Sequence, residues 1–131
     1  MILALILSFV LLVIAALHLL WAIGYWLPIR DEARLARAVV GTRGSATMPG
    51  AVPCALVVVA LLFAVSCLWW PPGTIRSLAL GAMGAVFLAR GAVTYTTFWR
   101  RLTPVEPFAT LDKRYYGPLC LAIGLGFATQ L

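Results

Sequence analysis

Long apolar runs separated by short polar stretches dominate the chain. The first run, residues 1–28, has no charged side chain and is interrupted only by Ser8 and His18. A bilayer span needs about 20 consecutive apolar residues, so this run predicts a membrane-spanning helix over residues 2–27. A signal peptide is the competing interpretation. The run lacks a basic start, however, and ends in aromatic residues instead of a small-residue cleavage site.

Three further apolar runs predict three more spans. The second is ended by Pro71, Pro72 and Gly73, because proline cannot continue a helix and glycine permits a turn. The third contains a single charge, Arg90, and the fourth is near the lower length limit for a span. The pattern therefore predicts one all-α domain, residues 1–131, built as a four-transmembrane-helix bundle. The four helices are expected over residues 2–27, 53–70, 75–99 and 112–131.

The segment between the first two spans has a different pattern. In residues 30–40, Arg30, Arg34 and Arg37 recur at helical spacing, while the apolar side chains, such as Leu35, lie elsewhere around the axis. Such a segment is typical of a short helix that lies in the membrane interface. We therefore expect an interfacial helix in the first loop.

The distribution of Lys and Arg predicts the orientation of the bundle. Loops that carry an excess of basic residues remain on the cytoplasmic side of a membrane. Eight basic residues fall in the first and third loops and one, Arg76, falls in the second. The eight are Arg30, Arg34, Arg37, Arg43, Arg100, Arg101, Lys113 and Arg114. We therefore expect a multi-pass protein of the bacterial inner membrane with both termini on the outer, periplasmic side.

Composition excludes several classes of protein. Hydrophobic residues make up 63 % of the chain and charged residues 11 %, whereas soluble domains have about 25 % charged residues. The net charge of +6 is explained by the basic inner loops and attraction to anionic lipid, so no nucleic-acid partner is expected. Cys54, Cys67 and Cys120 form no CxxC pair and predict neither a disulfide framework nor a zinc site. We expect no metal site and no cofactor.

Two strongly polar side chains lie inside predicted spans, His18 and Arg90. With the predicted helix ends, they lie about 13 and about 12 Å from the inner ends of their helices, at a similar depth. An arginine in a span costs about 2.5–3.5 kcal/mol and is expected to be paired and to face the bundle. The alternative for Arg90 is that its side chain snorkels to the inner headgroups or has a purely structural role in linking helices. A neutral core histidine bonded to a carbonyl is the alternative for His18.

Polar positions extend from these two residues toward the inner surface. Thr94, Thr97 and Arg101 follow Arg90 on one helix face, and Trp21 and Tyr25 follow His18. These two stripes predict one inward-opening polar cleft. Asp112 is the preferred counter-ion of Arg90 because it stands at the start of the fourth helix; the alternative is that it only caps this helix. The ligand-binding candidates are His18, Trp21, Tyr25, Arg90, Thr94, Asp112 and Tyr116.

Small residues on the fourth helix predict close helix packing. Gly117 and Gly124 lie seven residues apart on one face, and Gly124 and Ala128 form a small-xxx-small pair. Such residues allow the backbones of membrane helices to approach closely. We expect them to have a packing role.

Several short motifs resemble a known family. The motifs are His18-x-x-Trp21-x-x-Gly24, the run Phe87–Gly91, Phe108-x-x-x-Asp112, and Tyr116-x-Pro118-Leu119-Cys120. They resemble a bacterial family of small four-helix membrane proteins classed as a domain of unknown function, over almost the whole chain. The resemblance implies a four-helix inner-membrane protein without an established activity. It adds weight to His18, Trp21, Arg90 and Asp112 as a set.

Three classes of function fit this inventory. We favour a non-enzymatic binding or interaction protein whose cleft, with His18 and Arg90, holds an anionic lipid headgroup or a partner helix. The first alternative is a small membrane enzyme that uses His18 as acid or base on an amphipathic, lipid-like substrate. The second is a subunit of an oligomeric transporter, in which copies of the chain or another membrane protein are the partners.

Overall fold

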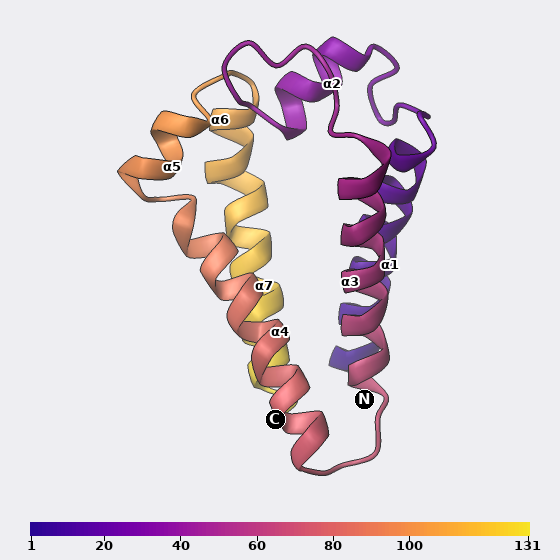
Figure 1. The fold of residues 1–131 in the computed structure, drawn as a ribbon. Helices are drawn as coiled ribbons and strands as arrows, with labels where there is room; N and C mark the ends of the chain where they lie inside the picture. Colours follow the sequence, from indigo (N-terminus) through magenta and orange to yellow (C-terminus); the bar gives the residue numbers. More distant parts are fainter.

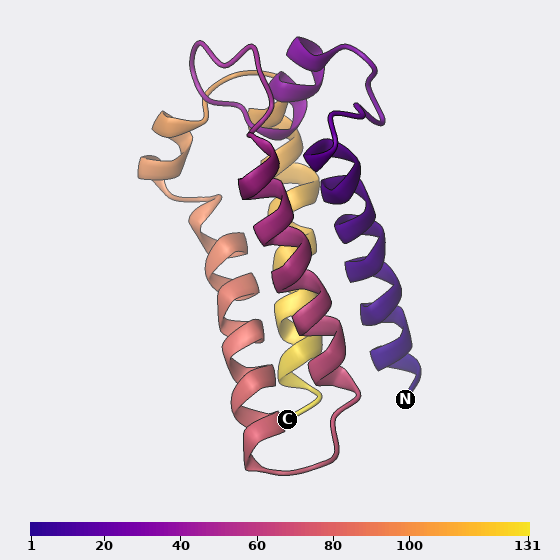
Figure 2. The same ribbon diagram turned by 45° about the vertical axis from the view of Figure 1, so that its right-hand side comes forward.

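The computed structural model describes all 131 residues, and its regular elements are all helical. Four rods run the length of the molecule, and the fourth is a continuous series of two α-helices with a π-helix between them (Figure 1). The rods are α1 (Ile2–Ala22), α3 (Ala51–Leu68), α4 (Thr74–Val93) and the series α6 (Phe108–Leu111), η1 (Asp112–Tyr116) and α7 (Gly117–Ala128). The short helices α2 (Glu32–Val39) and α5 (Thr97–Leu102) lie at one end, and both termini lie at the other (Figure 2).

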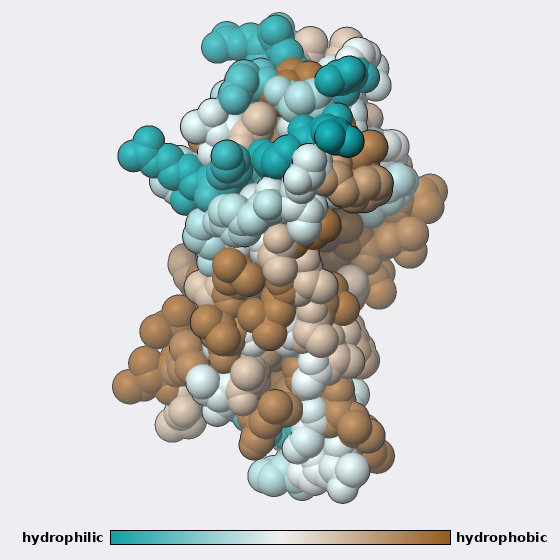
Figure 3. Space-filling model, turned by 90° about the vertical axis from the view of Figure 1, so that its left-hand side faces the viewer, coloured by the Kyte–Doolittle hydropathy of each residue, from teal (hydrophilic) through white to brown (hydrophobic).

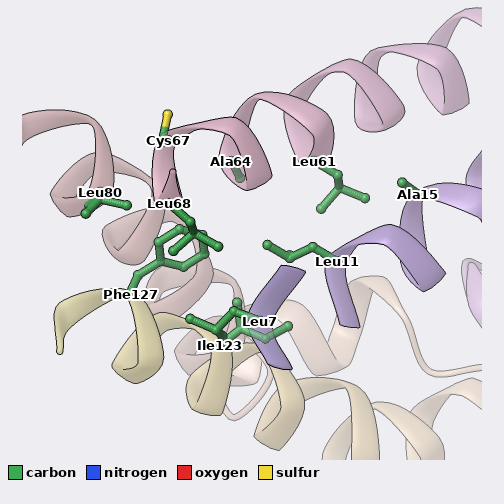
Figure 4. Packing of buried hydrophobic residues seen from close by; sticks show 10 residues of the cluster. All are labelled: Leu7, Leu11, Ala15, Leu61, Ala64, Cys67, Leu68, Leu80, Ile123 and Phe127. Carbon is green, nitrogen blue, oxygen red and sulfur yellow. The ribbon is translucent and has the colours of Figure 1, made fainter. Parts of the chain in front are cut away.

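The rods associate in two pairs. Helix α1 packs mainly on α3, and α4 packs mainly on α7, and Figure 1 shows the two pairs diverging toward the end that carries α2. The pairs meet near the termini in an apolar core, in which Leu11, Leu80 and Phe127 are fully buried (Figure 4). The core joins all four rods at that end of the molecule.

Three of the helices are long and apolar enough to cross a membrane: α1, α3 and α4. Many large apolar side chains on these helices are exposed, Phe9, Leu56 and Leu78 among them. Figure 3 shows an apolar surface over the body of the molecule and hydrophilic residues gathered at the end with α2 and α5. An exposed apolar surface of this extent is unfavourable in water and favourable in lipid. The all-α expectation is confirmed, and the three helices indicate a multi-pass membrane protein.

The predicted inner ends of the first and third spans were wrong by several residues. Helix α1 ends at Ala22 because Gly24 takes a φ of +80° and the chain turns back. The Trp21 Nε1 atom then donates to the Leu27 carbonyl at 2.7 Å, which holds this turn against the helix. His18 therefore lies four residues from the end of α1.

Helix α4 ends at Val93 because Thr94 and Thr96 follow it. The Thr96 hydroxyl donates to the Val93 carbonyl at 2.7 Å and accepts from the Trp99 amide at 3.2 Å, as the N-cap of α5. Threonine hydroxyls compete for backbone groups in this way and favour helix ends. Arg90 consequently lies in the last turn of α4, nearer to the end of its helix than the predicted span over residues 75–99 placed it.

The helix expected in residues 30–40 is confirmed as α2. Asp31 caps it by accepting from the Arg34 amide at 3.0 Å, and Leu35 is fully buried while Arg34 and Arg37 are exposed. These positions give α2 one basic face and one apolar face.

Helix α2 is attached to the fourth rod through Gly41. This glycine has a φ of +74°, and a Cβ atom there would overlap the Phe108 ring. Its carbonyl accepts from the Val105 amide at 3.1 Å. The Tyr116 hydroxyl adds a second link by donating to the Ala38 carbonyl at 3.0 Å. The end of the molecule with α2 is therefore closed by contacts between the first and third loops.

Arg76 ties together the helix ends at the opposite side of the molecule. Its Nη1 atom donates to the Gln130 carbonyl at 2.9 Å and its Nη2 atom to the Leu68 carbonyl at 3.4 Å. It therefore caps the C-terminal ends of α3 and α7, where a cation is favourable.

Replacement of this cap is expected to weaken the fold. Arg76→Met should lower the free energy of unfolding by about 1.5 kcal/mol, because two carbonyls lose a charged donor. The measurement is thermal unfolding in detergent, followed by tryptophan fluorescence. Arg101→Met, at an exposed position, is the matched control, and an equal loss in both variants would contradict the capping role.

Candidate functional site

The carboxylate of Asp112 is the centre of the site. Its side chain is fully buried, and Oδ1 accepts from Arg90 Nη2 at 2.8 Å. Oδ2 accepts from Arg100 Nη2 at 2.5 Å and from Trp99 Nε1 at 2.8 Å. Both oxygens are thus satisfied by strong, charge-assisted bonds, as a buried carboxylate requires. We call these four residues, together with Thr94, the Asp112 cluster.

Three elements contribute to the Asp112 cluster. The break after α4 turns the chain, so that α5 places Trp99 and Arg100 near the last turn of α4. Arg100 also reaches α6, where its Nη1 atom donates to the Ala109 carbonyl at 2.8 Å. Asp112 is the first residue of the π-helix η1. Short π-helical turns are rare in proteins, and those that occur are often found at functional sites.

Arg90 makes further contacts within the cluster. Its Nη1 atom donates to the Thr94 hydroxyl at 2.8 Å, and its Cζ atom lies 5.0 Å from the centre of the Trp99 ring. Thr94 is fully buried, whereas 33 % of the Arg90 side chain is exposed. The guanidinium is therefore held in a fixed orientation, with part of its surface accessible from outside the protein.

The charges of the Asp112 cluster do not balance. Arg90 and Arg100 each carry one positive charge against the single negative charge of Asp112, which leaves a net charge of +1. In addition, the buried Nε atom of Arg100 has no hydrogen-bond partner. A buried donor without a partner costs about 1–3 kcal/mol. The cluster thus has an excess of positive charge and of hydrogen-bond donors.

The structure brings together some of the residues that the sequence analysis grouped. Arg90, Thr94 and Asp112 come together, and Asp112 is the counter-ion of Arg90 as expected. The alternative that Asp112 only caps the fourth helix was wrong, because its side chain caps no helix and bonds to arginine and tryptophan side chains. The expected stripe ends at Thr94, since Thr97 and Arg101 belong to α5 and are exposed.

The prediction that His18 and Arg90 line one cleft was wrong. His18 and Trp21 line a cavity bounded by α1, the end of α2 and α3, and no residue of the Asp112 cluster lines it. His18 lies in the α1–α3 pair and Arg90 in the α4–α7 pair, so the packing in two pairs places them in separate sites. Tyr25 belongs to neither, since it is exposed and accepts from Arg30 Nη1 at 2.6 Å.

Tyr116 lies one turn beyond Asp112 and links the Asp112 cluster to α2. Its hydroxyl bonds to Ala38, and its ring lies 5.8 Å from that of Phe108. Trp99 and Arg100 were the residues missed by the sequence analysis. The one available signal was the pair of threonines at Thr94 and Thr96, which favours a helix end and thus a change of chain direction just before them.

These features define a helical membrane protein, with three candidate spans and a buried cluster of two arginines and an aspartate. The family described as "Protein of unknown function (DUF3995)" matches residues 11–127, and the chain belongs to that family. The resemblance found from short motifs is thereby confirmed. Comparisons with curated proteins and with solved structures gave no match.

Proposed function

We propose that the chain crosses the bacterial inner membrane four times, with α2 and α5 at the cytoplasmic face. The elements α6, η1 and α7 have four, five and 12 residues, and form an unbroken helical run of 21 residues. At 1.5 Å per residue, such a run extends about 31 Å, close to the thickness of the hydrocarbon core. The π-helix divides this run, so no single α-helix in it has the length of a span.

The distribution of basic residues supports this orientation. Seven exposed basic residues lie in α2, α5, η1 and the adjacent loops, and Arg76 is the one basic residue near the termini. The seven are Arg30, Arg34, Arg37, Arg43, Arg101, Lys113 and Arg114. Basic residues near the ends of spans favour the cytoplasmic side. Both termini then lie on the periplasmic side, since they are at the opposite end of the molecule (Figure 1).

The function that the Asp112 cluster supports best is the binding of an anionic lipid headgroup. The observation that carries this proposal is the net charge of +1 on a buried cluster in which Arg90 remains one-third exposed. Arg90 lies in the last turn of α4, at the end where lipid headgroups would be located. A phosphate oxygen is a strong acceptor for a guanidinium and would neutralise the excess charge.

A purely structural role, in which the Asp112 cluster only links helices, explains the arrangement less well. One carboxylate needs one arginine for a neutral pair, and the second arginine adds a charge and an unpartnered Nε atom. The enzyme alternative placed His18 beside Arg90, and it loses its geometric basis because the two residues occupy separate sites. We therefore propose binding, with no reaction at the cluster. The oligomeric transporter stays a prediction.

Arg90→Gln tests this function, because it removes the excess positive charge and leaves the neutral pair of Arg100 and Asp112. The wild-type protein, purified in mild detergent and placed in nanodiscs of mixed lipids, is expected to retain phosphatidylglycerol in preference to phosphatidylcholine. Arg90→Gln should lower the affinity for phosphatidylglycerol about tenfold, equivalent to about 1.4 kcal/mol. Bound lipid is measured by native mass spectrometry.

Arg76→Gln is the matched control, since it removes the same charge at the opposite end of the molecule. It should leave the preference for phosphatidylglycerol unchanged. Equal retention by wild type and Arg90→Gln, with both folded by tryptophan fluorescence, would show that the Asp112 cluster is a structural tie only. Competition by inorganic phosphate would show that the phosphate group, and not the acyl chains, is recognised.

A further inference from the structure

The cavity beside His18 contains three side chains that are typical metal ligands. Its volume is about 130 Å³, and it is lined by His18 from α1, Met48 from the loop before α3, and Cys54 from the first turn of α3. The other lining residues are one tryptophan, three valines and two prolines, and none has a carboxylate. Residues that carry an imidazole, a thioether and a thiol therefore line the same, mainly apolar cavity.

The imidazole of His18 is held by the backbone at one ring nitrogen, which leaves the other as the available ligand atom. Its Nδ1 atom lies 2.8 Å from the Ile14 carbonyl oxygen. A carbonyl can only accept, so Nδ1 carries a proton, and Nε2 is the ring nitrogen that could bind a metal. The ring is also in contact with that of Trp21, at a centroid distance of 4.7 Å. Histidines that bind metals almost always donate their other ring N–H in this way, which fixes the tautomer and the ring.

The two sulfur ligands are also well held. Cys54 and Met48 are 3 % and 7 % exposed. The backbone amide of Met48 donates to Glu32 Oε1 at 3.1 Å, which attaches its loop to α2. The thiol of Cys54 has only a weak contact, 3.8 Å from Sγ to the Pro49 carbonyl oxygen. A metal could replace this contact without the loss of a strong bond.

We infer that this cavity binds a soft monovalent metal ion, with Cu(I) as the best match. Thiolate and thioether ligands select Cu(I), whereas Mg²⁺ and Ca²⁺ require oxygen ligands that the cavity lacks. Structural Zn²⁺ sites are almost always four-coordinate, and the cavity offers three ligands. On binding, the S–H bond of Cys54 breaks, its proton goes to solvent and a Cu–S bond forms, with no change of oxidation state.

The charge balance favours a monovalent ion over a divalent one. A Cu(I) ion and one thiolate sum to zero, and His18 and Met48 are neutral ligands. A divalent ion with the same ligands would leave a charge of +1 in an apolar cavity, which is costly. His18 lies 30 residues before Met48, and Met48 and Cys54 are six residues apart, so their spacing in the sequence gave no metal-binding motif.

The test is an anaerobic titration of the purified full chain with Cu(I), in competition with a chromophoric Cu(I) chelator. The expected result is one high-affinity ion per chain and one proton released per ion. Met48→Leu conserves the side-chain volume and should weaken binding at least tenfold, as should Cys54→Ala. X-ray absorption of the loaded protein should show one nitrogen and two sulfur neighbours.

Matched controls are available in the same chain. Cys67→Ala and Cys120→Ala remove thiols that do not line the cavity, and should leave the affinity for Cu(I) unchanged. Arg90→Gln should also bind Cu(I) normally. The Cu(I) inference and the lipid proposal are therefore tested independently of each other. The inference would be overturned if wild type binds no Cu(I), or if Cys54→Ala and Met48→Leu bind it as tightly as wild type.

Discussion

Asp112→Asn is expected to lower the free energy of unfolding by about 3–5 kcal/mol, the usual cost of removing one partner from a buried ion pair. The substitution nearly conserves shape, yet it leaves Arg90 and Arg100 without a negative partner in a cluster whose centre is fully buried. One amide also cannot accept on both sides as the carboxylate does. Thermal or denaturant unfolding in detergent, followed by tryptophan fluorescence, measures the loss.

Asp31→Asn provides the matched control for this prediction. Asp31 is exposed and caps α2 through the Arg34 amide, and asparagine caps helices about as well as aspartate. Its effect should stay within about 0.5 kcal/mol, as for most surface substitutions. Similar losses in Asp112→Asn and Asp31→Asn would contradict the central role of the buried carboxylate.

A double-mutant cycle between Arg90 and Asp112 separates the ion pair from other effects. Arg90→Met should be much less harmful in the Asp112→Asn background than in the wild type, because it then removes an uncompensated charge. The expected coupling lies in the range of about 0.5–3 kcal/mol for directly bonded residues. Additive losses would show that the two residues act independently.

The pairing of Arg90 with Asp112 could be predicted from the sequence because membrane insertion restricts the alternatives. A charge in an apolar run needs a partner, and few acidic residues are available in this chain. Of these, Asp112 was the one placed at the start of a predicted span. The all-α class and the helix in residues 30–40 followed equally directly from apolar runs and from helical spacing.

The separation of His18 from Arg90 could not be predicted in the same way. Helices α1, α3 and α7 are apolar around most of their circumference, so the pattern does not identify the face that contacts a neighbour. Which rods form pairs depends on close packing between distant segments, and the sequence alone does not define these contacts. Equal depth in the membrane was therefore compatible with one shared cleft or with two sites.

The ends of the helices depended on local hydrogen bonds that apolar periodicity does not register. The predicted third span continued to residue 99 because no charged residue lies between Arg90 and Arg100. The hydroxyl of Thr96 instead starts a new helix, and this change of direction brings Trp99 to Asp112. Trp99, expected at the end of the third span, is therefore part of the Asp112 cluster.

Close packing of α4 on α7 depends on glycines that face the partner helix. A Cβ atom at Gly124 would lie 2.9 Å from the Leu88 backbone nitrogen, and one at Gly91 would lie 2.9 Å from the Gly117 carbonyl oxygen. Backbone atoms cannot move aside as a flexible side chain can, so the helices would have to separate. The packing role expected for Gly117 and Gly124 is confirmed, with Gly91 as an additional contact from α4.

Gly91→Ala and Gly124→Ala are therefore each expected to destabilise the fold by about 1–3 kcal/mol, the usual cost of overpacking. Gly81→Ala is the matched control within α4, because a Cβ there meets only the Leu131 side chain, at 3.9 Å. This control should instead stabilise the fold by about 0.5–1 kcal/mol, since alanine is the better helix former. Opposite signs in unfolding experiments in detergent would therefore separate helix contact from helix propensity. Stabilisation by all three substitutions would show that α4 and α7 do not approach as closely as the structure places them.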